Sequence, residues 1–205
     1  MNPMDLTNKD VLQDPGVRLM LAYQAGDESA FDRIVGEYAG QVFALLTRFL
    51  GSAPGREDLA QDVFVRVIRA RARYQPTARF STWLYRIVFN LCVNEKERMA
   101  RRSVVATESV RIVDDAGLAS FADPDGPDPT AGLEQADIVT AVREAIAALP
   151  PAQRMALVLS KYDDLSYAEV ALAMGSTEKA IKSMVHRARE NLRARLHPYL
   201  SEELL

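Results

Sequence analysis

Five polar or basic side chains recur at three- and four-residue steps near the end of the chain: Lys179, Lys182, Ser183, His186 and Arg187. On a helix this spacing places them along one stripe. Donors in such a stripe can enter the major groove of duplex DNA and bind base edges and phosphates. An ordinary pair of helices with a solvated basic face is the alternative interpretation.

The residues that precede this stripe favour DNA binding. Ser166 and Glu169 have the spacing of a capping box, which begins a short helix. Gly175 tolerates the positive φ of a tight turn, and Ala171 is small enough for two helices to cross closely. The apolar residues at the inner faces are Val170, Met174, Ile181 and Met184 or Val185. Together these residues predict a helix-turn-helix.

A second group of residues, between 74 and 96, combines aromatic and basic side chains. Rings that stack on unpaired bases, beside cations that hold phosphates, are typical of single-strand binding. Asn90 and Asn94 lie one helical turn apart and can present amides to a base edge. We therefore expect a single-strand site made of Tyr74, Arg79, Phe80, Trp83, Asn90, Asn94 and Lys96. Alternatively the aromatic residues are core, and spacing alone favours this for Trp83 and Tyr85.

A third group lines one face of residues 57–66 and consists of Asp58, Gln61, Asp62, Val65 and Arg66. Carboxylates four residues apart can form a metal or acid–base site, but no His joins them, so a solvated or partner-binding face fits better. His186 and His197 lack the spacing of zinc ligands, and Cys92 has no evident His partner. There is also no glycine-rich phosphate loop. We expect no catalytic residue, no metal and no cofactor, hence no enzyme.

The formal net charge of −3 hides a strong segregation of charge along the chain. Residues 64–102 carry ten Lys and Arg against two Glu, and residues 176–195 carry six against two. Residues 103–137, between them, carry one Arg against eight acidic residues. Two basic blocks around an acidic one suggest two polyanion-binding surfaces.

Helices have to position these groups, because apolar residues recur at helical spacing through both basic halves. We predict an all-α fold of two small helical domains joined by a flexible acidic linker, the second domain being the helix-turn-helix. The predicted boundaries are a loose N-terminal extension at 1–16, a first domain at 17–102, a linker at 103–137, a second domain at 138–197 and a short tail at 198–205.

Two further features concern the compartment. The sequence has neither an apolar run of 18 residues nor a basic-then-apolar start, so we expect no membrane insertion and no secretory signal. Cys92 is the single cysteine and fits a buried, reduced thiol. Both features favour a cytoplasmic protein.

At its motifs the sequence resembles the sigma-70 family, specifically its small two-domain extracytoplasmic-function branch. The resemblance covers roughly residues 17–102 and 138–197. Several independent motifs carry it, in the same order as in the family: Gly26–Phe31, Glu57–Phe64, Phe80–Asn90, Leu149–Arg154, Leu165–Ala171 and Ala180–Arg189.

The resemblance implies a factor that binds core RNA polymerase, recognises promoter −35 and −10 elements and promotes DNA melting. The face with Asp58 and Arg66 would hold the clamp of the largest polymerase subunit, and the single-strand site would read the −10 element. The resemblance assigns the −35 element to Thr177, Lys179, Lys182, Ser183, His186 and Arg187. It also implies an anti-sigma factor as a partner.

Two other classes of function compete with this one. A conventional activator or repressor would use the last helices on duplex DNA, but it leaves the aromatic–basic group and the Asp58–Arg66 face unexplained. A nucleic-acid enzyme would need a metal or nucleophile cluster. Co-purification with core polymerase separates the first interpretation from these two.

Overall fold

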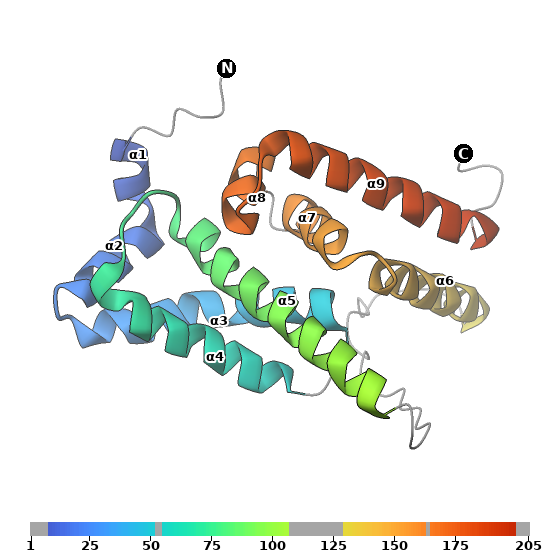
Figure 1. The fold of residues 1–205 in the computed structure, drawn as a ribbon, viewed down its shortest axis with the longest axis horizontal. Helices are drawn as coiled ribbons and strands as arrows, with labels where there is room; N and C mark the ends of the chain where they lie inside the picture. Colours follow the sequence, from blue (N-terminus) through green and yellow to red (C-terminus); the bar gives the residue numbers. More distant parts are fainter. Residues whose placement is uncertain (1–7, 52–54, 107–128, 163–164, 200–205) are drawn as a thin grey trace.

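The computed structural model describes residues 8–51, 55–106, 129–162 and 165–199. Within these ranges the chain forms helices and no strands (Figure 1), which confirms the predicted all-α class. The elements in chain order are α1 Asn8–Gln13, α2 Pro15–Gln24, α3 Glu28–Leu50, α4 Arg56–Ala70, the 3₁₀ turn η1 Arg71–Arg73, α5 Phe80–Ala106, α6 Pro129–Ala147, α7 Pro151–Tyr162, α8 Tyr167–Met174, α9 Glu178–Leu196 and η2 His197–Tyr199.

Helix α3 forms the centre of the first domain. Its buried residues recur at three- and four-residue steps and are Ala30, Ile34, Tyr38, Val42, Leu45, Leu46 and Phe49. Helices α2, α4 and α5 pack against it. Three neighbouring helices therefore bury the apolar side of the amphipathic helix α3.

Prolines begin three of the described helices. Pro15, Pro129 and Pro151 are the first residues of α2, α6 and α7. Proline suits this position because its ring fixes a helical φ and its missing N–H has no partner in the first turn. These prolines begin helices, although in the sequence two of them fall in the predicted extension and linker.

Helices extend into two regions that the sequence predicts to be irregular, the N-terminal extension and the linker. Helix α1 occupies part of the predicted loose extension, and Val11 within it is buried. Helix α5 continues to Ala106, and α6 begins at Pro129, so both enter the predicted linker at 103–137. Residues 107–128 of that linker, together with 200–205 of the predicted tail, lie outside the described residues.

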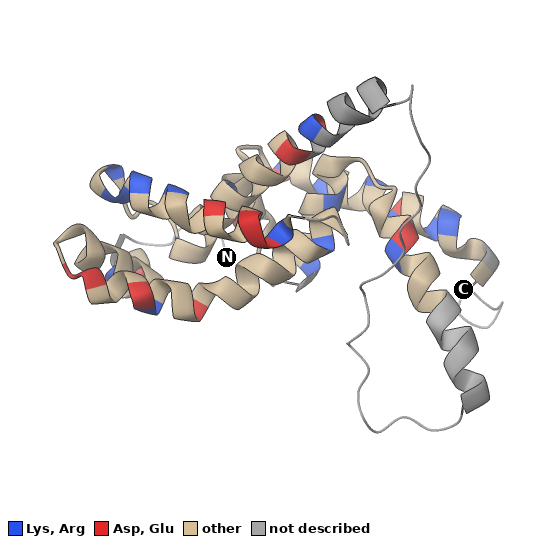
Figure 2. Ribbon diagram, turned by 90° about the horizontal axis from the view of Figure 1, so that it is seen from below, with Lys and Arg blue, Asp and Glu red and all other residues tan. Residues whose placement is uncertain are grey.

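The second domain packs directly on the first. Helix α8 contacts α5 and helix α7 contacts α3, as Figure 1 shows for the orange helices beside the green one. Buried apolar residues of both domains belong to one continuous cluster, from Val11 to Ala188. Basic and acidic residues are interspersed along the helices rather than gathered on one of them (Figure 2).

Candidate nucleic-acid interface

The predicted helix-turn-helix forms with the capping box and the turn expected from the sequence. The Ser166 hydroxyl accepts a hydrogen bond from the Glu169 backbone N–H, and the Glu169 carboxylate accepts one from the Ser166 backbone N–H at 2.9 Å. Gly175 ends α8 in the left-handed region, with φ 62°. The Thr177 hydroxyl then caps α9 by accepting from the Ala180 N–H at 3.2 Å. These contacts fix the angle at which α9 leaves the turn.

The inner faces of the two helices are buried as predicted. Val170, Ala171, Ile181 and Val185 are each at most 6% exposed, while Met174 and Met184 are partly buried against the same cluster. Burial of this face leaves the opposite face of α9 to solvent. The exposed residues there are Lys179, Lys182, Ser183, His186 and Arg187, and Thr177 is exposed at the start of the helix.

Lys182 is the member of this stripe with a charged partner in the described structure. Its ammonium lies 2.7 Å from the Glu178 carboxylate one turn earlier, and its side chain is 58% exposed. An exposed pair of this kind contributes little free energy because water screens it. Lys182 can therefore exchange Glu178 for a phosphate or a base edge at small cost.

The aromatic part of the predicted single-strand site is largely core. Tyr74 is 5% exposed and Phe80 is fully buried, so neither ring offers a face to a nucleotide in this structure. The Phe80 ring lies 4.9 Å from Tyr38, and Tyr74 lies 4.9 Å from Trp83, both in edge-on geometry. Burial of these rings holds the loop at residues 74–79 against the domain. Stacking of Tyr74 and Phe80 on bases therefore stays a prediction, and it would require both rings to leave their buried positions.

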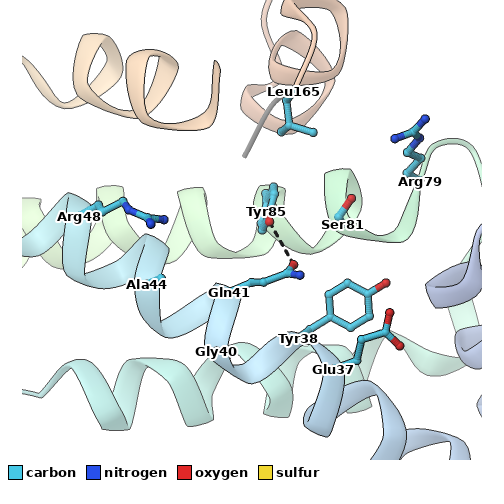
Figure 3. Close-up of a pocket in the computed structure, with 10 residues that line it drawn as sticks. All are labelled: Glu37, Tyr38, Gly40, Gln41, Ala44, Arg48, Arg79, Ser81, Tyr85 and Leu165. Atoms are coloured by element: carbon cyan, nitrogen blue, oxygen red, sulfur yellow. Dashed lines mark hydrogen bonds between the residues drawn. The ribbon is translucent and has the colours of Figure 1, made fainter. Parts of the chain in front are cut away.

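Trp83 and Tyr85 have different environments. Trp83 is partly buried and packs against Tyr74 and Phe80, whereas Tyr85 is 3% exposed. The sequence favoured a core position for both, and Tyr85 has one. Its hydroxyl donates to the Gln41 side chain at 3.3 Å (Figure 3).

The polar members of the predicted single-strand site lie on the surface of α5 and the preceding loop. Arg79, Asn90 and Asn94 are exposed. Arg79 directly precedes α5, and Asn90 lies about three helical turns further along. Lys96 lies in α5, but the position of its side chain is outside the described residues.

Asn94 also lines a pocket of about 380 Å³ between α4 and α5. The other walls include Asp58, Asp62 and Arg66. The structure thus brings Asn94 beside the predicted partner-binding face, a proximity that the sequence did not reveal because these residues lie 28 to 36 positions before Asn94.

The predicted partner-binding face of α4 is solvent-exposed. Asp58, Gln61, Asp62 and Val65 are exposed, Arg66 is partly buried, and Ile68 beside them is 45% exposed. Glu57 and Asp58 stand in the first turn, where carboxylates favour the positive end of the helix dipole. The face therefore combines charge with two exposed apolar side chains.

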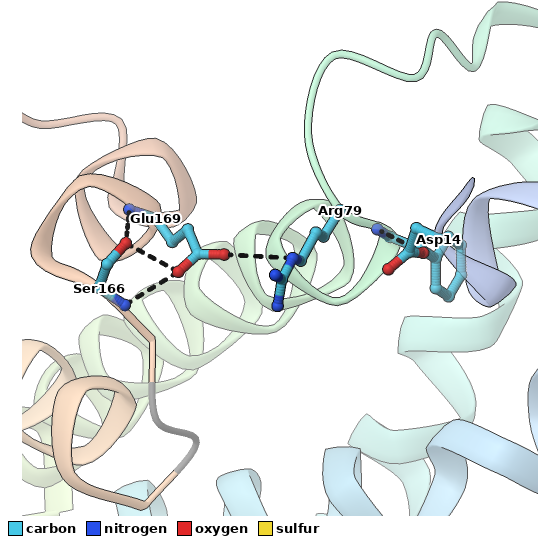
Figure 4. Close-up of polar contacts among 5 residues, drawn as sticks. Asp14, Arg79, Ser166 and Glu169 are labelled. Atoms are coloured by element: carbon cyan, nitrogen blue, oxygen red, sulfur yellow. Dashed lines mark hydrogen bonds and ion pairs between the residues drawn. The ribbon is translucent and has the colours of Figure 1, made fainter. Parts of the chain in front are cut away.

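The polar contacts that join the domains include two between described residues. The Arg79 guanidinium Nε lies 3.6 Å from Oε1 of Glu169, whose other oxygen belongs to the capping box (Figure 4). Arg154 of α7 is 2% exposed and donates from Nη1 to the Phe49 carbonyl at 2.5 Å. Beside these contacts lies a groove of about 620 Å³ lined by residues of α3, the start of α5 and Leu165, among them Arg48 and Arg79 (Figure 3).

The sequence predicted no contact between domains for Arg154 or Glu169: Arg154 received no role, and Glu169 was predicted only as part of the capping box. Burial lowers the pKa of the Arg154 guanidinium. Its Nε and Nη2 have no hydrogen-bond partner among the described residues. Because arginine is normally exposed, nothing in the sequence signals that this residue is buried between domains.

Within the described part of the chain, no three His, Cys, Asp or Glu side chains are placed to hold a metal ion. The same part contains no helix long and apolar enough to cross a bilayer.

Known families match both halves of the chain. Residues 34–102 match the family description "Sigma-70 region 2", and residues 140–192 match "Sigma-70, region 4". The RNA polymerase sigma-H factor of Pseudomonas aeruginosa is 31% identical over 93% of this chain and 98% of its own length. The chain belongs to the sigma-70 family.

Further relatives place it in the extracytoplasmic-function branch. The ECF RNA polymerase sigma factor SigW of Bacillus subtilis is 30% identical over 83% of this chain and 91% of its own length. The ECF RNA polymerase sigma-E factor of Escherichia coli K12 is 31% identical over 86% and 92%. This chain is accordingly a promoter-recognising sigma factor for transcription initiation by RNA polymerase, and the family is one of regulators rather than enzymes.

Two solved structures share the fold. CnrH, solved in complex with the cytosolic domain of CnrY, superimposes with a TM-score of 0.60 and 25% identity over 88% of this chain and 96% of its own. The sigma factor RpoE of Bartonella quintana, solved with the anti-sigma factor NepR, gives a TM-score of 0.64 at 20% identity over 82% and 96%.

Proposed function

We propose that the two domains of this sigma factor divide promoter recognition between them. Helix α9 reads the −35 element as closed duplex, and the 74–79 loop with α5 reads and opens the −10 element. One observation carries the proposal: on α9 the polar stripe is exposed while Ile181, Val185 and Ala188 on the opposite face are buried. The helix can therefore bind a groove without any loss of core packing.

The −35 contacts are assigned to Thr177, Lys179, Lys182, Ser183, His186 and Arg187. Of these, Arg187 and Lys182 have the chemistry for the O6 and N7 acceptors of guanine. Thr177 stands at the start of the helix, where its hydroxyl already serves as the cap, so a contact to DNA there would come from the neighbouring N–H groups.

The −10 contacts are assigned to Arg79, Asn90, Asn94 and Lys96, with Trp83 as the aromatic residue that keeps some exposed surface. Arg79 supplies a cation for phosphate, and Asn90 supplies an amide that can pair with the edge of an unpaired base. Tyr74 and Phe80 take a supporting role, because their buried rings hold the loop against the first domain.

The polymerase contact is assigned to Asp58, Gln61, Asp62, Val65 and Arg66 of α4, which would meet the clamp of the largest subunit. Exposed Val65 and Ile68 support this assignment, since a binding face commonly places apolar side chains among polar ones. We further infer an anti-sigma partner, a cytoplasmic location and the absence of catalysis. Two proteins of similar structure were solved with a second protein bound, and in one of them, the sigma factor RpoE, the bound protein is named as an anti-sigma factor.

Substitutions on α9 test the assignment to the −35 element. In the full chain, Lys182→Ala and Arg187→Ala should each weaken binding to a −35 duplex by about 1–3 kcal/mol, measured by gel shift at fixed salt. Arg195→Ala is the matched control, because Arg195 is an exposed arginine on the same helix outside the stripe. Wild-type affinity in both stripe variants would refute the role of this face.

A further inference from the structure

Helix α2 packs within the first domain, and the residues at its two ends contact the two ends of the 74–79 loop. Its N-cap residue is Asp14 and its last residue is Gln24. The family descriptions that match this chain begin at residue 34, so neither residue is part of the matched region.

Asp14 holds the end of the loop. Its Oδ1 accepts a hydrogen bond from the Val17 N–H at 2.9 Å, which caps α2. The same oxygen accepts one from the N–H of Phe80 at 3.3 Å, the first residue of α5 (Figure 4). The first N–H groups of a helix have no partner within it, and a carboxylate is the strongest acceptor for them. One carboxylate thus joins the starts of two helices.

Gln24 holds the beginning of the loop. Its Nε2 donates to the Arg71 carbonyl at 2.9 Å and to the Tyr74 carbonyl at 3.2 Å. These carbonyls belong to η1 and to the first residue of the loop. The Arg71 guanidinium, in turn, lies 4.2 Å from the centre of the Tyr23 ring on α2.

Gly16 lets α2 approach closely enough for both contacts. A Cβ at this position would lie 2.4 Å from the Tyr38 hydroxyl and 2.7 Å from the Phe80 side chain. Phe80 itself is fully buried. The helix, its two end residues and the aromatic residues below the loop therefore form one packed unit.

We propose that α2 is a brace for the loop, and that Asp14 and Gln24 are positioning residues for recognition of the −10 element. A loop fixed at both ends presents Arg79 and the start of α5 in one arrangement before DNA arrives. The entropy cost of ordering the loop is then no longer part of the free energy of DNA binding. This inference rests on the proposed role of the loop and α5 in opening the promoter.

Substitutions at Asp14 can separate bracing from helix capping. Asp14→Ser keeps a good N-cap for α2, but its hydroxyl is one bond shorter and should not reach the Phe80 N–H. Asp14→Asn keeps an oxygen at the position of Oδ1 and should behave like the wild type. Gln24→Ala removes the donors at the other end. Gln41→Ala is the control, because it removes a side-chain amide of the same domain that bonds Tyr85 instead of the loop.

Two readouts are needed, and the first does not involve DNA. Asp14→Ser and Gln24→Ala should speed amide hydrogen exchange in residues 71–80 of the free chain. In the holoenzyme, permanganate reactivity of −10 thymines on a promoter it transcribes should fall about fivefold, the effect of losing one ordinary hydrogen bond. Core-polymerase affinity should stay unchanged, and both Asp14→Asn and Gln41→Ala should match the wild type in both readouts.

The outcomes distinguish the brace from the function on which it rests. Unchanged exchange in Asp14→Ser and Gln24→Ala would overturn the brace itself, and faster exchange with normal opening would overturn its role in positioning. In both cases Asn90→Ala and Arg79→Ala would still reduce opening if the −10 assignment is correct. Normal opening in those two variants as well would instead show that the assignment of the −10 surface has failed.

Discussion

Asn90 is the residue on which the account of promoter opening depends most. It is exposed on α5, so its amide is not committed to a buried backbone group of the first domain. An exposed amide adds little to stability, yet it can form two directional hydrogen bonds to a base. The expected consequence of its loss is therefore functional rather than structural.

Asn90→Ala should reduce promoter opening without unfolding the protein. Losing recognition of one base corresponds to about 1–3 kcal/mol, or about five- to more than a hundred-fold in open complex. Permanganate reactivity of −10 thymines measures this step, and a gel shift with the −35 duplex measures closed binding, which should barely change. A variant that is folded and opens the promoter normally would remove Asn90 from the site.

The aromatic residues show where prediction from sequence ended at this scale. Aromatic residues beside cations fit a stacking surface and a domain core equally well, because spacing does not reveal which side of a loop is covered. In the structure, Phe80 is covered by α2 and α3 through Gly16 and Tyr38, and Tyr74 packs against Phe80 and Trp83. Polar residues were easier to place, since Arg79, Asn90 and Asn94 are exposed as expected.

At the scale of elements, the sequence predicted best where local interactions decide the structure. The Ser166–Glu169 capping box and Gly175 both stand at the boundaries expected from their residue types. The sequence does not predict the beginning of α6, because Pro129 follows an acidic, proline-rich stretch, and a stretch of that composition is typical of a linker. The helical character of α1 was missed for a similar reason, since its stability comes from contacts such as those of buried Val11.

Gly175→Ala should destabilise the helix-turn-helix through backbone strain alone. A Cβ at this residue would meet nothing within 4 Å, but φ is +62°. We expect a loss of about 1–2 kcal/mol in the free energy of unfolding, measured by denaturant titration. Gly36→Ala is the control: it also has open space but lies within α3, where alanine should stabilise by about 0.5–1 kcal/mol. Equal effects in both variants would mean that the turn does not require glycine.

At the scale of the whole molecule, the docking of the two domains is the feature that the sequence did not reveal. Amphipathic spacing shows that one side of a helix is buried, but not whether the covering surface belongs to the same domain. Burial of Arg154 against the Phe49 carbonyl is a further departure from expectation, because a guanidinium is costly to bury without a carboxylate.

The docked arrangement cannot reach both promoter elements at once. Elements centred 25 base pairs apart are separated by about 85 Å along duplex DNA. In the structure, Glu169 of α8 lies 3.6 Å from Arg79 at the start of α5. The proposed −35 and −10 surfaces are thus much closer together than their targets, and the domains have to separate on the promoter.

Energy transfer between dyes on the two domains should report this separation. Asp32→Cys and Arg195→Cys provide exposed labelling sites, whereas the native Cys92 is buried. Transfer should be high in the free chain and should drop when holoenzyme binds a promoter. Arg154→Glu should lower transfer in the free chain because it places a carboxylate against the Phe49 carbonyl, and exposed Arg189→Glu should not. Low transfer in the labelled free chain that keeps Arg154 would contradict the docked arrangement.

If this chain confers promoter specificity on core RNA polymerase, promoter-specific run-off transcription should depend on its presence. Core enzyme, with and without the purified chain, is given a pool of promoter fragments from the source organism. Discrete transcripts should appear only when the chain is present, and they should be lost with Arg187→Ala and with Asn90→Ala while Arg195→Ala retains them. If the chain binds duplex DNA but its addition to core enzyme yields no promoter-specific transcript, it does not act as a promoter-specificity factor.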